Sequence, residues 1–134
     1  MAMMTMMNPM RFMQKDYVAN NAMKIYGGKL RDDPELLGNL TDRLAAGADA
    51  AGSVMYQMMA LMGWTSLHWL HQIRQPTLII HGRGDPIMSP TNAQTIAIRI
   101  PNARLELVDC GHAFVLTLAN EIAAMVDDFL GGAS

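Results

Sequence analysis

The 134-residue chain lacks several features that would assign it quickly to a class of protein. Its single cysteine, Cys110, excludes an intrachain disulfide framework. Ten basic and twelve acidic residues leave a formal net charge of −2, which gives no basic face for nucleic acid. No apolar run is long enough to span a membrane or to form a signal peptide. We therefore expect a cytoplasmic protein without nucleic-acid partners.

Two short motifs stand out in the second half of the chain. An apolar segment, residues 77–81, runs into a turn that carries Asp85, and residues 105–108 run into a Gly-His turn that carries His112. Reacting groups of parallel sheets lie beyond the carboxyl ends of the strands, where both side chains are expected. The sequence therefore predicts an acid–base pair in the chain order that the Ser/Asp/His triads of α/β-hydrolases use.

The nucleophile that such a pair would activate is missing from the sequence. The expected Gly-x-Ser-x-Gly turn does not occur. Ser53 follows Gly52 without a second glycine, and Ser66 stands in the wrong frame after Gly63. A complete hydrolase of this class also needs about twice as many residues. We therefore expect part of an enzyme that is inactive by itself.

Alternative interpretations exist for each residue of the two turns. Asp85 would often be only an Asx-type turn residue, and a lone His112 would more often be structural. Asp109 is a rival for the acid, but it lies very close to His112 in sequence. Cys110 is a rival nucleophile, although its place two residues before His112 disfavours productive geometry, so we expect a buried small residue.

The first part of the chain, residues 1–72, has the pattern of helices. Asp33 is placed to cap a helix that begins at Pro34. A second apolar stripe follows over residues 51–62 and ends at Gly63. Methionine, with 14 residues, is concentrated in this part. It suits surfaces that accept varied apolar partners, but it is equally a good helix former that needs no ligand.

The second part, residues 73–134, alternates strand, helix, strand and helix. Ser89 and Pro90 begin the first helix, and the apolar stripe of the last helix runs to Leu130, before Gly131. The uninterrupted apolar residues of the first strand predict helices on both of its faces. The fold class is therefore α/β, with a helical region at 1–72 followed by a βαβα unit at 73–134.

Several longer stretches of the sequence point to one family within this fold class. The string GWTSLHWL at residues 63–70, followed by QPTL at 75–78, resembles the C-terminal half of intracellular poly(3-hydroxyalkanoate) depolymerases, which are α/β-hydrolases. RIPNA at 99–103 belongs to the same resemblance, which extends upstream through KIYGG at 24–28. The resemblance implies a partial α/β-hydrolase fold, in which residues 1–72 form the cap and the remainder forms the last two core strands.

The resemblance also implies roles for individual residues. Ionised Asp85 would accept the Nδ1 hydrogen of His112, whose Nε2 would take the proton of a serine and return it to the leaving alcohol. Trp64 and Trp69 would line a substrate-binding cleft for an ester or polyester, or pack within the cap. No metal or organic cofactor is implied, and the oxyanion-hole loop is absent along with the nucleophile.

A second function class stays open at this point. The chain could be a non-catalytic module from a truncated or split gene that binds apolar polymer surfaces or a partner chain supplying the serine. A first strand that is apolar on both faces also leaves an unpaired edge. We therefore expect a homo-oligomer whose interface contains residues 77–81 or the stripe at 51–62, or a complex with that partner chain.

Overall fold

The computed structural model describes residues 8, 15–46, 56–57 and 59–132. The methionine-rich start and most of the predicted stripe at 51–62 lie outside these residues. Within the described part, no helix combines the length and the apolar character that crossing a membrane requires. The elements are α3 (Lys15–Ile25), the 3-10 helix η1 (Gly28–Asp32), α4 (Pro34–Ala46), the 3-10 helix η3 (Leu70–Gln72), β1 (Thr77–Gly82), α6 (Pro90–Arg99), β2 (Ala103–Val108), α7 (Phe114–Thr117) and α8 (Ala119–Gly132).

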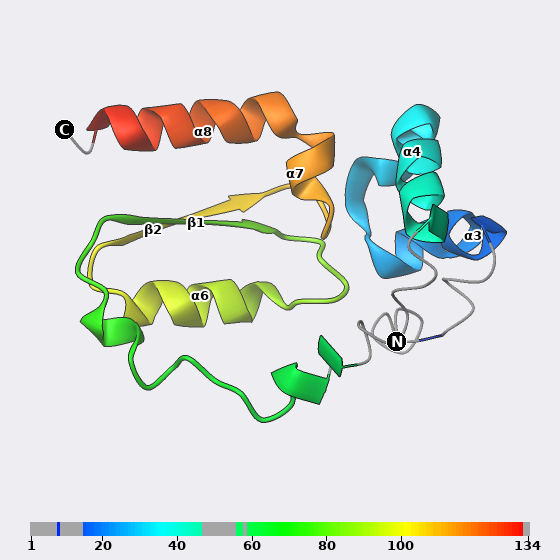
Figure 1. The fold of residues 1–134 in the computed structure, drawn as a ribbon. Coiled ribbons are helices and arrows are strands. Elements are labelled where there is room, and N and C mark those ends of the chain that lie inside the picture. Colours follow the sequence, from blue (N-terminus) through cyan, green and yellow to red (C-terminus); the bar gives the residue numbers. More distant parts are fainter. Residues whose placement is uncertain (1–7, 9–14, 47–55, 58, 133–134) are drawn as a thin grey trace.

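The two strands form a parallel pair between two helices. Strand β1 pairs with β2 in register from Thr77 opposite Ala103 to Gly82 opposite Val108. Helix α6 covers one face of the pair and α8 covers the other (Figure 1). This sandwich confirms the α/β class and the prediction that β1 is covered on both faces. Among the described residues, no strand lies against the second edge of β1.

Local signals in the sequence account for where the helices begin. Asp33 Oδ1 accepts the N–H of Leu36 at 2.9 Å, which caps α4 as predicted. Ser89 Oγ accepts the N–H of Thr91 at 3.3 Å and caps α6, with Pro90 at its first position.

The end of the last helix differs from the sequence prediction. Helix α8 was expected to stop before Gly131, but it continues through Gly132. The reason is that neither glycine takes the positive φ angle that a glycine C-cap requires. A glycine inside a helix costs about 1 kcal/mol relative to alanine, which does not by itself end a helix.

A small helical unit, α3–η1–α4, lies beyond the carboxyl ends of the two strands (Figure 1). Its core is the cluster of Ile25, Tyr26 and Leu30, all three buried. Tyr17 and several leucines of α4 pack around this cluster. Two residues of the strand-end turns, Ile87 and Ala113, also pack against it, so the helical unit and the βαβα unit share this core.

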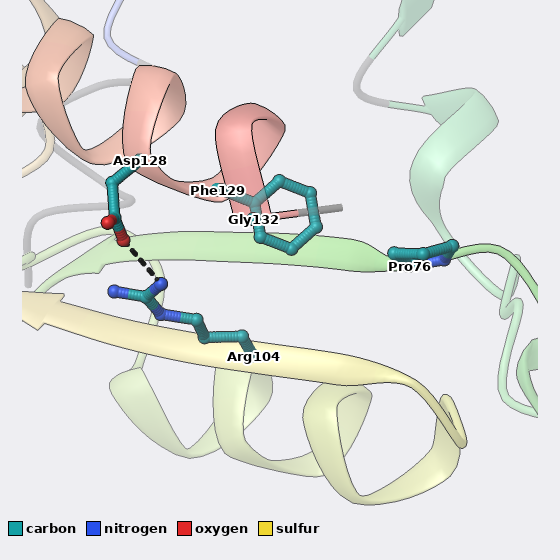
Figure 2. Close-up of a pocket in the computed structure, with 5 residues that line it drawn as sticks. All are labelled: Pro76, Arg104, Asp128, Phe129 and Gly132. Atoms are coloured by element: carbon teal, nitrogen blue, oxygen red, sulfur yellow. Dashed lines mark hydrogen bonds and ion pairs between the residues drawn. The ribbon is translucent and has the colours of Figure 1, made fainter. Parts of the chain in front are cut away.

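At the opposite end of the sheet an ion-pair network ties α8 to β2. Arg104 Nη1 lies 2.7 Å from Asp128 Oδ2, and its Nε lies 2.8 Å from Glu106 Oε1. Both carboxylates raise the pKa of Arg104, Asp128 more strongly. Figure 2 shows the contact between Arg104 and Asp128. Both residues line an open hollow of about 350 Å³, together with Pro76 and Phe129. This hollow lies near the amino ends of the strands, away from Asp85 and His112.

Candidate active site

The turns that follow the two strands bring Asp85 and His112 together. His112 Nδ1 lies 2.7 Å from Asp85 Oδ2, although the residues are 27 positions apart in sequence. The Asp85 side chain is only 2% exposed, whereas that of His112 is 38% exposed. The pair therefore has a buried carboxylate and an imidazole that the solvent, or another segment, can reach.

The second oxygen of Asp85 holds its own turn. Oδ1 accepts the backbone N–H groups of Ile87 at 2.8 Å and Met88 at 2.9 Å, the pattern of an Asx-type turn. The turn interpretation and the acid interpretation are therefore compatible, because each uses a different oxygen of Asp85. The turn fixes the carboxylate so that Oδ2 faces the histidine.

Opposing effects act on the pKa of Asp85. Burial alone would raise it, but the hydrogen bonds from Met88, His112 and Ile87 outweigh the burial. The pKa of the Asp85 carboxyl is therefore lowered, and the group is ionised at neutral pH. An ionised carboxylate only accepts hydrogen bonds, so the hydrogen of a neutral His112 ring resides on Nδ1 and its Nε2 can accept a proton.

The lowered pKa of Asp85 predicts a loss of stability in acid. A carboxyl whose pKa is lower in the folded state contributes stability above its ordinary value of about 3.9 and loses it as the pH falls through the folded value. We expect the urea midpoint of the chain to fall as the pH drops below the ordinary carboxyl pKa toward the lowered pKa of Asp85. The Asp85→Asn variant should lack that part of the decline, whereas Asp109→Asn, at an exposed position, should retain it. An identical acid profile in Asp85→Asn would contradict the assignment.

A second histidine lies near the same carboxylate, and the sequence prediction gave it no role. His81 Nε2 is 3.8 Å from Asp85 Oδ2, and His81 Nδ1 is 2.8 Å from the carbonyl oxygen of Gly82. A carbonyl only accepts, so Nδ1 carries a hydrogen, and a proton on Nε2 would point at the carboxylate. The signal available in the sequence was a histidine at the end of the apolar segment 77–81, four residues before Asp85.

The pair borders a mainly apolar hollow of about 220 Å³. His81, Asp85 and His112 form its polar corner. The remaining lining comes from β1, the turn after it, α6 and the start of α7, with Ile79, Met88, Asn92, Ala93, Ile96 and Phe114.

The other candidate residues lie elsewhere. Asp109 is exposed, and Cys110 is buried with its Sγ 3.1 Å from Thr117 Oγ1, as expected for a small packing residue. In the part of the chain that the structure describes, no group of three His, Cys, Asp or Glu side chains could hold a metal ion.

The two tryptophans, Trp64 and Trp69, lie away from Asp85 and His112. Their rings meet edge to face at 6.2 Å, and Trp64 and Trp69 are 62% and 46% exposed. Arg99, the last residue of α6, donates to the carbonyl of Leu67, which places the tryptophan segment near the end of α6 that points away from Asp85. Their role in substrate binding stays a prediction.

Comparison with known proteins agrees with this architecture. Residues 48–117, more than half of the chain, match the family model described as the α/β hydrolase fold. The chain therefore belongs to the α/β-hydrolase fold family.

Within that family the relatives include esterases and a depolymerase. The chain is 41% identical over 125 residues to the poly(3-hydroxyalkanoate) depolymerase of Ectopseudomonas oleovorans, covering 93% of this chain and 44% of that protein. It is 36% identical over 77 residues to the pimeloyl-[acyl-carrier protein] methyl ester esterase of Aromatoleum aromaticum, covering 57% of this chain and 30% of the esterase. The resemblance stated from the sequence motifs is thus confirmed.

A solved structure shares the fold. The crystal structure of MGS-M2, an α/β hydrolase enzyme from a Medee basin deep-sea metagenome library, superimposes with a TM-score of 0.58 at 22% identity. The match covers 94% of this chain and 46% of that enzyme. The chain thus spans less than half the length of each of these relatives.

Proposed function

We propose that this chain supplies the acid and the base of a serine-type carboxylic ester hydrolase, and that another segment supplies the nucleophile. The observation that carries the proposal is the 2.7 Å hydrogen bond between buried Asp85 and accessible His112 at the carboxyl ends of adjacent parallel strands. The absence of a Gly-x-Ser-x-Gly turn from the sequence supports the second half of the proposal.

The chemistry follows from the hydrogen bonds that fix the Asp85 carboxylate against the His112 ring. His112 Nε2 takes the hydroxyl proton of the serine as that oxygen attacks the ester carbonyl carbon. Asp85 stabilises the imidazolium that forms and keeps its Nδ1 hydrogen in place. The imidazolium then gives its proton to the leaving alkoxide oxygen, which leaves an acyl-serine for water to hydrolyse by the same proton transfers in reverse order.

The substrate class is proposed from the relatives. Both a depolymerase of poly(3-hydroxyalkanoate) and a methyl ester esterase match this chain, so their shared chemistry is cleavage of a carboxylic ester. The depolymerase matches the longer stretch at the higher identity, which favours a polyester of hydroxy acids. In this proposal residues 1–72 are the cap region and residues 73–134 are the core region.

A second candidate function is a non-catalytic module that binds an apolar surface. The observation that favours it is a run of exposed apolar side chains between residues 56 and 69, namely Tyr56, Met59, Leu61, Met62, Trp64 and Trp69. Exposed apolar patches of this kind mark interaction sites. Cosedimentation of the catalytically dead His112→Ala chain with polyester granules would separate this function from catalysis.

Because the proposal places the nucleophile on another segment, it predicts that the isolated chain is a very poor esterase. Since the nucleophile is proposed to lie on another segment, we expect the isolated chain to hydrolyse p-nitrophenyl butyrate no faster than an equal concentration of free imidazole does. The assay compares the wild type with His112→Ala and Cys110→Ser. Strong turnover that survives His112→Ala would place the chemistry elsewhere, and turnover that disappears in Cys110→Ser would make the cysteine the nucleophile.

A further inference from the structure

We infer that the turn Tyr26–Gly28 is a positioning element that sets the geometry between Asp85 and His112, an inference that rests on the acid–base function proposed above. The carbonyl oxygen of Tyr26 accepts the backbone N–H of His112 at 2.6 Å. The main chain of the base is therefore held by a segment of the helical unit, not by its own strand.

Two glycines let this turn approach the site. Gly27 and Gly28 have φ angles of 63° and 62°, in the left-handed region that favours glycine. A Cβ atom on Gly28 would collide with the backbone nitrogen of Gly111 and would lie 2.8 Å from Cys110 Sγ. A Cβ atom on Gly27 would lie 2.8 Å from the carbonyl oxygen of Gly84. One turn thus touches both the acid turn and the base turn.

The packing around the turn repeats this arrangement. Ile87, two residues after Asp85, and Ala113, directly after His112, both pack against the buried cluster of Ile25, Tyr26 and Leu30. The acid turn and the base turn are therefore seated on one common support. The distance between Asp85 Oδ2 and His112 Nδ1 depends on that support as well as on the pairing of β1 with β2.

The close approach of Gly28 to the base turn predicts what a methyl group at this position would do. Alanine at position 28 must push the Gly111–His112 main chain away from the turn, which lengthens the bond from His112 to Tyr26 and moves the imidazole off the carboxylate. Misplacement by about 1 Å is enough to cost a catalytic constellation on the order of 100-fold in rate. Gly28 is thus a positioning residue, since it acts through His112.

The test reads the hydrogen bond itself in the isolated chain, so it does not depend on a nucleophile or on activity. The low-field Nδ1 proton resonance of ¹⁵N-labelled His112, assigned by its absence in Asp85→Asn, is compared between wild type and Gly28→Ala. We expect this resonance to be lost in Gly28→Ala, and the His112 backbone amide to exchange about tenfold faster or more. Gly63→Ala and Gly38→Ala are matched controls, since Gly63 shares the positive φ angle and neither glycine has an atom within 4 Å of an added Cβ.

The outcomes separate positioning from mere stability. A folded Gly28→Ala chain that keeps the Nδ1 resonance and the slow amide would overturn the inference, whatever its melting temperature. If that variant does not fold, native-state hydrogen exchange of the wild type decides instead. The inference requires the His112 amide to exchange with the same opening free energy as the amides of residues 25–30. Exchange with the opening free energy of β2 alone would refute it. Failure of the ester hydrolase proposal would leave these readouts unchanged, so the two ideas fail separately.

Discussion

Asp85→Asn is expected to lower the turnover of the completed hydrolase by about 10⁴-fold, because the amide no longer holds the Nδ1 hydrogen or stabilises the imidazolium. The completed enzyme is made by coexpressing this chain with the part of the Ectopseudomonas oleovorans depolymerase that it does not match. Turnover of a soluble hydroxyalkanoate ester, measured at equal concentrations of assembled complex, gives the ratio. His112→Ala should cost a similar factor.

The matched control for this experiment is Asp109→Asn. Asp109 is the other carboxylate near the base in sequence, but it is exposed, and the hydrogen-bond partner of His112 Nδ1 is Asp85. We expect less than about a twofold change in turnover, the range for a surface substitution away from the chemistry. A ranking in which Asp109→Asn is the more damaging variant would transfer the acid role to Asp109.

The second large effect concerns assembly through the edge of β1. Thr77 donates its N–H to Asn102 and Arg83 donates to Val108, so these alternate residues face β2. The backbone groups of Leu78 and Ile80 therefore point to the other edge, against which the described residues place no strand. Because such an edge readily pairs with another chain, we expect sedimentation equilibrium at micromolar concentration to give a dimer or larger species.

Leu78→Pro tests this edge with little cost to the β1–β2 pair. Proline removes one outward N–H and is tolerated where a strand edge is free. We expect it to return the chain to monomer mass, whereas Leu78→Ala, which keeps the N–H, should remain associated. Adding the nucleophile-bearing segment should likewise displace the second copy, if that segment binds the same edge. A wild-type chain that is monomeric and well folded would rule out pairing through this edge.

Sequence reasoning succeeded where the determinants are local. The Asx turn at Asp85, the caps at Asp33 and Ser89 and the apolar run of β1 are each written within a few neighbouring residues, so the elements could be predicted close to their observed ends. The meeting of Asp85 with His112 was predictable because the carboxyl ends of adjacent parallel strands share one edge.

The rest depends on contacts that no local pattern encodes. The bond from Tyr26 to His112 joins distant parts of the chain, and the sequence shows only two adjacent glycines at 27 and 28. The proximity of His81 to the carboxylate depends on how its ring turns at the end of β1. Glycine after an apolar stripe predicts the end of the last helix before Gly131, but α8 continues through Gly132 because the backbone there does not take a positive φ angle.

The unequal anchoring of the two turns also decides how the site responds to heat. The Asp85 turn packs on the helical unit through Ile87, but it also has hydrogen bonds of its own, from the N–H groups of Ile87 and Met88 to Asp85 Oδ1. The backbone N–H of His112 instead donates a hydrogen bond to the carbonyl oxygen of Tyr26 in the α3–η1–α4 unit. Parts of a protein can open locally before the whole unfolds. Opening of α3–η1–α4 would break the bond from His112 to Tyr26 and leave the turn bonds of Asp85 intact. Thermal inactivation would then begin below the melting temperature of the sheet, with the base released while the acid is still in place.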